Sequence, residues 1–178
     1  WASYQLAWRK ERNASMETLE FPFPYRKGQR EMVAGVYHAI SEEEQIFIQA
    51  PTGIGKTMSA IFPAVRAVGQ GKGETVFYLT ARTITRTVAE DAFSILRGKG
   101  LHFKSITITA KEKMCFCDEM DCDPQKCPYA KGHYDRINDA VYELWTKEEA
   151  FDRETILAKA EKYSVCPFEM TLDLAVWM

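Results

Sequence analysis

Eight consecutive residues in the first third of the chain have the types and spacing of a phosphate-binding loop. They are Ala50, Pro51, Thr52, Gly53, Ile54, Gly55, Lys56 and Thr57. Gly53 and Gly55 allow backbone N–H groups to turn inward around phosphate oxygens, where a Cβ atom would clash. Lys56 can place a positive charge on the β- and γ-phosphates, and the Thr57 hydroxyl can ligate Mg²⁺. The pattern therefore predicts a site for ATP and Mg²⁺.

The segments on either side of this loop match the strand and the helix that normally flank it. Residues 45–49 form a short apolar run, which is typical of a buried strand. After the loop, apolar residues recur at helical spacing: Met58, Ala60, Ile61, Phe62, Val65 and Val68. The start of this helix would add the positive end of its dipole to the phosphate site. The alternative is a chance loop at a helix start, but the order strand, loop, helix favours the phosphate site.

A second group of polar residues lies upstream of the loop. Prolines in residues 21–24 predict an extended segment, and the following residues predict a helix with one apolar face. Tyr25, Arg26 and Gln29 lie at the start of that helix. A glutamine amide offers one donor and one acceptor, which matches an adenine edge. A solvent-exposed helix start is the alternative.

The composition is that of an ordinary globular protein. Of 178 residues, 46% are hydrophobic and 27% are charged, and no apolar stretch is long enough to span a membrane. The net charge of -2 excludes a globally basic nucleic-acid binder but not a local basic track. We expect a cytoplasmic protein, and we interpret the chain, which starts at Trp1 and stops at Met178, as a fragment of a longer one.

Strands and helices are expected to alternate through the first 110 residues. Residues 75–80 and 103–109 are predicted to be further strands, with a helix between them. This alternation indicates an α/β fold with a parallel sheet, which binds ligands at the carboxyl ends of its strands. The phosphate loop and the turn at Arg82 and Thr83 should lie at that edge. A solvated turn is the alternative for these two residues.

The five cysteines follow this region. They are Cys115, Cys117, Cys122, Cys127 and Cys166. An odd number of cysteines in a protein that should bind cytosolic ATP argues against a disulfide framework and favours metal or cluster ligation. The segment 111–128 has no helix or strand period, whereas 134–145 and 153–162 predict helices. One inorganic centre could join this loop to Cys166.

The spacing favours an iron–sulfur cluster over zinc. Structural zinc commonly uses CxxC pairs, which this chain lacks. Cys127 and Cys166 each precede a proline, which is a familiar flank of cluster ligands. Zinc and unligated thiols remain the alternatives. Cys117 is the expected spare, because it is two residues from Cys115 and would share its direction. His133 could be a ligand, but a surface position at a helix start is favoured.

The glutamine cluster, the phosphate loop and the cysteine-rich insertion together resemble the XPD/DinG family of iron–sulfur DNA helicases in superfamily 2, in particular bacterial DinG-like members. The resemblance covers about residue 21 to the end. It implies part of a RecA-like P-loop motor domain with a small iron–sulfur insertion of loop and helices. The expected divisions are an upstream helix or linker (1–20), motor domain (21–110), cluster domain (111–170) and a return to the motor domain (171–178).

The resemblance also implies an activity and a set of site residues. The family unwinds duplex DNA with ATP, usually 5′ to 3′, and carries a [4Fe–4S] cluster. The implied assignments are adenine reading by Tyr25, Arg26 and Gln29, phosphate binding by residues 50–57, catalysis by Lys56 and Thr57, cluster ligation by Cys115, Cys122, Cys127 and Cys166, and DNA contact by Arg82, Thr83 and Lys111. The implied partners are single-stranded and forked DNA, with a monomeric protein and no membrane.

Three departures from the family pattern limit this expectation. The Asp-Glu-Ala-His box and the second motor domain are absent from the chain, so we expect the chain alone neither to hydrolyse ATP efficiently nor to unwind DNA. Lys111 stands where many relatives have arginine. Lysine keeps the positive charge but lacks the planar fork of the guanidinium group. The competing interpretations are a P-loop ATPase with a zinc-stapled insertion and an ATP-independent module that binds single-stranded DNA.

Overall fold

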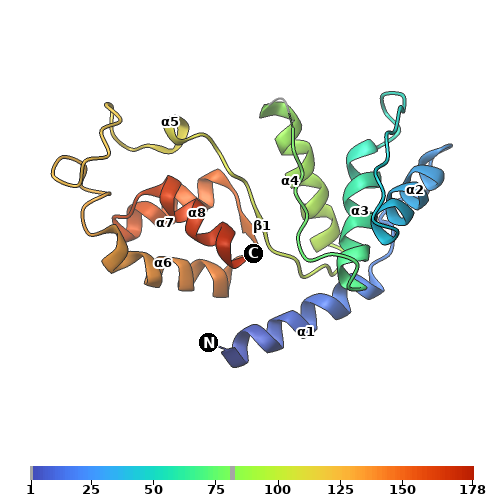
Figure 1. Ribbon diagram of the computed structural model, residues 1–178, viewed down its shortest axis with the longest axis horizontal. Helices are drawn as coiled ribbons and strands as arrows, with labels where there is room; N and C mark the ends of the chain where they lie inside the picture. The colour runs from blue at the N-terminus through green and yellow to red at the C-terminus, as the bar shows by residue number, and fades with distance from the viewer. Residues whose placement is uncertain (1, 81–82) are drawn as a thin grey trace. The chain divides into compact units, whose positions relative to one another are not determined.

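The computed structural model describes residues 2–80 and 83–178, and the chain forms two compact units, residues 1–103 and residues 104–178. The helices of the first unit are α1 (Ala2–Thr18), α2 (Gln29–Ser41), α3 (Lys56–Gly69) and α4 (Thr83–Arg97). The elements of the second unit are β1 (Ser105–Ile106), α5 (Lys111–Met114), α6 (His133–Lys147), β2 (Ala150–Phe151), α7 (Arg153–Tyr163) and α8 (Pro167–Trp177). Figure 1 shows this order by colour.

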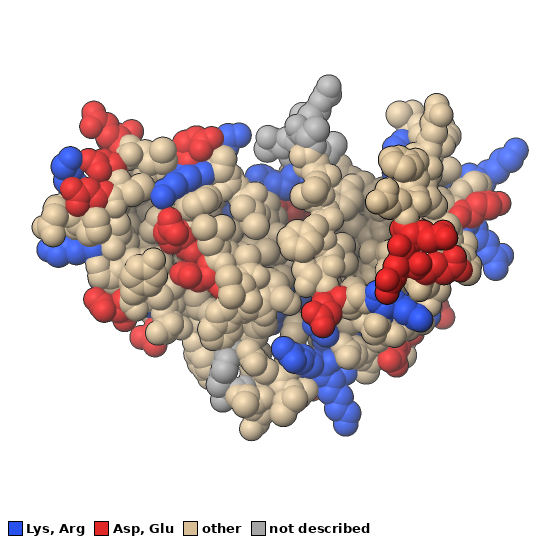
Figure 2. All heavy atoms as spheres, viewed as in Figure 1, with Lys and Arg blue, Asp and Glu red and all other residues tan. Residues whose placement is uncertain are grey.

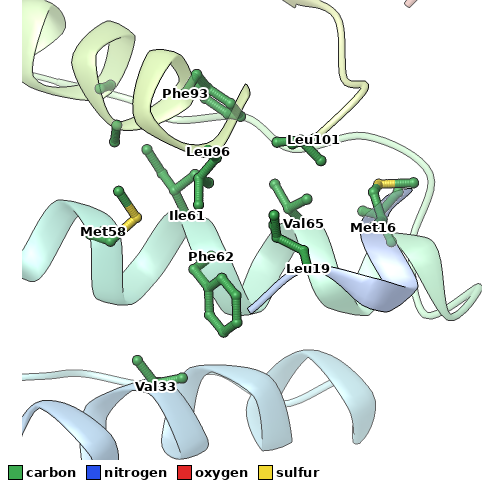
Figure 3. Packing of buried hydrophobic residues seen from close by; sticks show 13 residues of the cluster. Met16, Leu19, Val33, Met58, Ile61, Phe62, Val65, Phe93, Leu96 and Leu101 are labelled. Atoms are coloured by element: carbon green, nitrogen blue, oxygen red, sulfur yellow. The ribbon is translucent and has the colours of Figure 1, made fainter. Parts of the chain in front are cut away.

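Helix α3 is the centre of the first unit, because it packs against α1, α2 and α4. Its apolar side chains point in several directions, as Figure 3 shows. Ile61 and Val65 face α4, where Leu96 is fully buried, and Phe62 points toward Val33 of α2. These contacts form one continuous cluster that removes the α3 side chains from water. The helix predicted after the phosphate loop is therefore confirmed.

Helix α1 crosses α3 at a glycine. A Cβ atom on Gly69 would lie 2.6 Å from the Met16 Cβ, so no larger residue fits there. Ser15 adds a polar contact, since its hydroxyl accepts the His102 backbone N–H at 2.9 Å. A helix therefore occupies most of residues 1–20, and it is held against the core of the first unit.

Two of the expected strands are wrong. Residues 45–49 and 75–80 belong to no strand, and no strand pairing occurs among the described residues of the first unit. Most of their apolar side chains face solvent: Phe47 is 94% exposed, Phe77 81% and Leu79 88%, whereas Val76 is partly buried against the core. A strand needs a neighbour to satisfy its backbone groups, and neither segment has one within the described residues.

The second unit holds the two-stranded sheet that the described residues form, and this sheet is parallel. Ser105 pairs with Ala150, and Ile106 pairs with Phe151. The third strand expected at 103–109 is therefore present but reduced to two residues. Parallel strands need a long connection, which here contains α5, the cysteine loop and α6.

Helices α6, α7 and α8 pack together to form the core of the second unit. The helices predicted at 134–145 and 153–162 are confirmed with slightly longer bounds. Asp152 caps the N-terminus of α7, because its carboxylate accepts the Thr155 N–H at 2.8 Å. The division expected between residues 170 and 171 falls inside α8. Among residues 2–80 and 83–178, no helix combines the length and apolar character needed to cross a membrane.

Candidate functional site

The phosphate loop ends at the first turn of α3. Gly53 and Gly55 both have φ of +83°, in the left-handed region that favours glycine. Gly55 is the residue that precedes α3, and Lys56 is the first residue of this helix. Free N–H groups and the positive end of the helix dipole therefore point into the loop. This local geometry suits an anion such as a phosphate group.

Two side chains of the loop, Lys56 and Thr57, contact protein groups whose place a bound nucleotide could take. The Lys56 ammonium donates to the carbonyl oxygens of Ala50 and Pro51, at 3.1 and 3.0 Å. The Thr57 hydroxyl lies 3.4 Å from the Tyr78 hydroxyl. Tyr78 was not a predicted site residue, because the sequence gives no local sign that residues 75–80 return to the loop.

Gln29 and Arg26 contact the phosphate loop from the start of α2. The Gln29 side chain is 4% exposed, and its Oε1 accepts the Arg26 backbone N–H at 3.0 Å. A Cβ atom on Gly55 would lie 2.7 Å from Gln29 Nε2. The Arg26 guanidinium donates to the Gly53 carbonyl oxygen. These contacts join the start of α2 to the loop, while adenine reading by Gln29 stays a prediction.

Tyr25 and two hydrophobic neighbours complete this side of the loop. Tyr25 stacks on Phe21 with ring centroids 4.4 Å apart, and Phe21 in turn packs edge-on against Phe62 of α3. Phe21 is therefore a supporting residue that sequence reasoning missed. Ile54 lies close to Gly28, since a Cβ atom added to this glycine would be 3.4 Å from Ile54 Cδ1.

Two of the three residues predicted to contact DNA are neighbours in the sequence, and Lys111 is described below. Arg82 lies outside the described residues, and Thr83 begins α4. Arg86, one turn into the helix, forms an ion pair with Glu90 at 3.6 Å. The contacts assigned to Arg82 and Thr83 therefore stay predictions.

All five cysteines line one cavity of about 210 Å³ in the second unit. Cys115, Cys117, Cys122 and Cys127 come from the loop between α5 and α6, and Cys166 comes from the residue before α8. None of the five forms a disulfide. The structure thus brings together the four predicted ligands and the predicted spare, although α6 and α7 separate Cys166 from the others in the sequence.

The spacing of these thiols bears on the kind of metal centre that they could hold. Within the described part of the chain, no group of three or more His, Cys, Asp or Glu side chains is gathered closely enough to hold a single metal ion. An iron–sulfur cluster contains several metal atoms, so its ligand sulfurs lie farther apart than those of one ion. Five soft thiols around one cavity fit the ligand preference of such a cluster.

Two of these thiols have raised pKa values. Burial raises the pKa of Cys117 from 9.0 to about 11, and the hydrogen bond with Cys127 adds to this shift. The two sulfurs are 4.0 Å apart. Burial also raises the pKa of Cys166. These thiols hold their protons at neutral pH, so a metal centre must displace protons when it binds.

The surface position favoured for His133 is wrong. The residue is 3% exposed, and its ring lines the cysteine cavity. Nδ1 accepts the backbone N–H of Cys166 at 3.2 Å, and Nε2 lies 3.3 Å from a carboxylate oxygen of Asp173. The local sequence around Gly132 suggested a helix start in solvent, but α8 covers it. Asp173 lies 40 positions away, which no local pattern could reveal.

Lys111 lies beside the same cavity. Its ammonium forms an ion pair with Glu169 at 3.2 Å and lies 5.3 Å from the centroid of the Phe168 ring. The hydrogen bond with Glu169 raises the pKa of Lys111. Its predicted contact with DNA is not tested by this geometry, but a DNA phosphate would have to compete with the Glu169 carboxylate. Glu169 is another residue that the sequence did not single out.

Comparisons with known proteins agree with the phosphate loop. The family of DEAD/DEAH box helicases matches residues 26–151, which is more than half of the chain. A curated protein of Methanocaldococcus jannaschii, described as a probable ATP-dependent helicase, is 36% identical over 47 residues. That match covers 26% of this chain and 7% of the other protein. No solved structure matches the chain.

The family match includes the Gln29 region, the phosphate loop and the cysteine loop between α5 and α6. It therefore spans the nucleotide site described above rather than an unrelated part of the molecule. The chain belongs to the DEAD/DEAH box helicase family, which implies a RecA-like P-loop fold, the use of ATP and Mg²⁺, and binding to nucleic acid.

Proposed function

We propose that this chain is the nucleotide-binding part of an XPD/DinG-like DNA helicase that moves 5′ to 3′ on single strands and unwinds forked DNA. In this proposal Cys115, Cys122, Cys127 and Cys166 hold a [4Fe–4S] cluster, and Cys117 is the spare thiol. The observation that carries it is the convergence of five cysteines on one cavity, in a chain that also carries a phosphate loop. The motor part is assigned to residues 21–110, and the cluster part to residues 111–170.

The ATP site would work through exchange of hydrogen-bond partners. Lys56 would leave the carbonyl oxygens of Ala50 and Pro51 and bind the β- and γ-phosphates, while Thr57 would ligate Mg²⁺. Lys56 already directs its ammonium toward backbone atoms of the loop. The charge that develops on the transferred phosphoryl group would be stabilised by this lysine and the metal.

Adenine recognition would use the start of α2. Tyr25 is 44% exposed and offers a ring face, and the Gln29 amide offers a donor and an acceptor. Arg26 ties this segment to Gly53, so base binding and the phosphate loop would be mechanically connected.

The DNA contacts are assigned to Arg82, Thr83 and Lys111. Basic and acidic side chains are interspersed on the face drawn in Figure 2, which agrees with the small net charge. A few local contacts to sugar and phosphate, rather than a broad basic surface, would therefore bind the strand. Such contacts ignore base sequence and weaken as salt rises.

The cysteine cavity would have a structural role. When bound, a [4Fe–4S] cluster supplies four iron–thiolate bonds, which would join the loop between α5 and α6 to the start of α8. This loop is otherwise poorly held, since the exposed residues of 118–126 contribute no side chain to the buried apolar core. The chain's own residues would orient the sulfurs and exclude water from one side of the cavity.

Zinc is a second candidate, because one pair of sulfurs has a suitable separation, although among the described residues no third ligand is gathered closely enough to complete a single-ion site. Ligand sulfurs of a tetrahedral zinc ion with bonds of about 2.3 Å lie roughly 3.8 Å apart. Cys117 and Cys127 are 4.0 Å apart. A zinc site would therefore use Cys117, whereas the proposed cluster does not.

Metal analysis of the anaerobically purified chain separates these candidates. The proposal expects iron and acid-labile sulfide with broad visible absorption, and zinc would give a colourless protein. Cys122→Ser should lose the iron, while Cys117→Ser should retain it. Zinc in place of iron, or iron loss in Cys117→Ser with retention in Cys122→Ser, would contradict the ligand assignment.

DNA binding is tested separately by fluorescence anisotropy with a labelled single strand. We expect an affinity that falls with salt and decreases in Arg82→Ala, compared with Arg9→Ala as a control on the exposed surface of α1. An affinity that is the same with and without an ATP analogue would instead favour an ATP-independent binding module.

A further inference from the structure

The ring of His133 connects α6 to the segment that carries Cys166. His133 is the first residue of α6, and Cys166 directly precedes α8. Nδ1 accepts the Cys166 backbone N–H at 3.2 Å, and Nε2 lies 3.3 Å from Asp173 Oδ2 on α8. The side chain is only 4% exposed, so water competes little for either nitrogen.

These partners define the tautomer of the ring. A neutral imidazole carries one proton, and Nδ1 must be unprotonated because it accepts an N–H. The proton therefore lies on Nε2, which donates to Asp173. Both nitrogens bind the same segment, one at Cys166 and one in the second turn of α8. The orientation of the ring and the position of the Cys166 backbone are thus linked.

Cys166 needs such a contact more than the other cysteines do. The other four share the loop between α5 and α6, whereas Cys166 arrives after α6 and α7. Arg136 holds the start of this connection, since its guanidinium donates to the carbonyl oxygens of Tyr163 and Ser164 at 3.1 and 2.6 Å. His133 holds the cysteine itself. Neither nitrogen of His133 is free to be a metal ligand in this arrangement.

We propose that His133, oriented by Asp173, is the positioning residue that keeps the Cys166 sulfur at the cavity and so determines how firmly the chain retains a thiolate-bound metal centre. Mutation of groups that orient the ligands of a metal centre typically lowers the metal affinity by about 10- to 100-fold. This inference rests on the proposed function, which supplies the metal centre. It adds a role for His133, which is not one of the proposed ligands.

The test uses two amide substitutions that each keep one half of the contact. In His133→Asn, the amide oxygen takes a place close to Nδ1 and can still accept the Cys166 N–H. In His133→Gln, the amide reaches toward Asp173 but leaves that N–H without its acceptor. Both variants remove the ring and retain a polar side chain, so they are matched for the loss of imidazole.

Three quantities are measured on the anaerobically purified chain: metal and sulfide content, the rate at which a chelator removes the metal, and the unfolding midpoint after metal removal. We expect His133→Gln to release metal roughly 10- to 100-fold faster than wild type and His133→Asn to stay close to wild type. The metal-free midpoints of the two variants should be similar, because the difference lies at the cysteine and not in the core.

Each outcome decides the matter. Equal release rates for wild type and His133→Gln would overturn this inference and leave the proposed function intact. Equally fast release from His133→Asn, or a metal-free midpoint of His133→Gln far below that of His133→Asn, would assign the effect to folding and also overturn it. A wild-type chain that binds no metal at all would overturn the proposed function and this inference together.

Discussion

The Lys56 ammonium donates to the Pro51 carbonyl oxygen at 3.0 Å. A second bond, to Ala50, gives this charge two backbone partners inside the loop that should bind phosphate. A bound nucleotide must therefore give the Lys56 ammonium stronger hydrogen bonds than these two carbonyl oxygens do. The oxygens of a negatively charged phosphate group meet that condition, because hydrogen bonds between ionised groups are shorter and stronger than bonds to neutral carbonyls.

Lys56→Ala should therefore weaken nucleotide binding. A hydrogen bond to a charged group contributes about 1.5–3 kcal/mol, so the dissociation constant for a fluorescent ADP analogue should rise roughly 10- to 150-fold. Lys72→Ala is the control, since it removes an exposed lysine in the turn after α3. Equal affinities for the two variants would show that Lys56 does not bind the nucleotide.

The parts of the fold that the sequence predicted correctly are those set by nearby residues. The helix after the phosphate loop follows from apolar spacing in α3, and the loop from two glycines with positive φ. Two of the three expected strands failed, at 45–49 and 75–80, because pairing depends on a distant neighbour and not on the apolar run itself. Residues 45–49 have strand-like composition and yet place Phe47 in solvent.

The candidate site shows the same division. Spacing alone grouped the cysteines and proposed a shared centre, and they do line one cavity. The burial of His133 could not be predicted, because its partners are distant in the sequence. Cys166 directly precedes α8, and Asp173 lies within α8. The pairing of Lys111 with Glu169 likewise joins residues 58 positions apart. Such contacts depend on packing that local patterns do not contain.

Gly53 and Gly55 should respond differently to alanine, although both have φ of +83°. The left-handed conformation costs a residue with a Cβ atom about 1–2 kcal/mol at either position. A Cβ atom on Gly53 meets nothing within 4 Å, whereas one on Gly55 would lie 2.7 Å from Gln29 Nε2. Gly55→Ala must therefore also displace the buried Gln29 amide, at a further cost of about 1 kcal/mol.

Urea unfolding of the two glycine variants measures this difference. Adding Gln29→Ala should remove the extra cost of Gly55→Ala but leave the effect of Gly53→Ala unchanged. Equal destabilisation by Gly53→Ala and Gly55→Ala would show that Gln29 does not pack against the loop.

Ile61 and Phe47 provide a test of which apolar residues are in the core. Ile61 is 1% exposed and lies between α3 and α4, so Ile61→Ala should lower the free energy of unfolding by about 2–5 kcal/mol. Phe47 is 94% exposed, so Phe47→Ala should change it by about 0.5 kcal/mol or less. A loss from Phe47→Ala as large as that from Ile61→Ala would indicate that residues 45–49 are buried in a sheet after all.

Glu143 should make the stability of the second unit depend on pH. Its carboxylate accepts from Lys162 at 2.6 Å and from the Tyr163 hydroxyl at 2.7 Å, and two further lysines lie 3.1 Å away. These hydrogen bonds, that from Lys162 most of all, hold the pKa of Glu143 well below its ordinary value of 4.5. A carboxylate whose pKa is lower in the folded chain stabilises the fold above its unfolded-state pKa, and this stabilisation is lost as the pH falls toward the folded-state pKa.

The difference in unfolding midpoint between wild type and Glu143→Gln should therefore be largest at neutral pH and should shrink as the pH falls below about 4.5. Glutamine keeps the shape of the side chain but has no charge to pair with the lysines, so its own contribution does not change over this range. Glu161→Gln is the matched control, because Glu161 is an exposed residue of α7. Its difference from wild type should be small at every pH. The difference in unfolding midpoint between wild type and Glu143→Gln could instead stay constant from neutral to acidic pH. That result would mean that the four neighbours of this carboxylate fix its position without stabilising its charge.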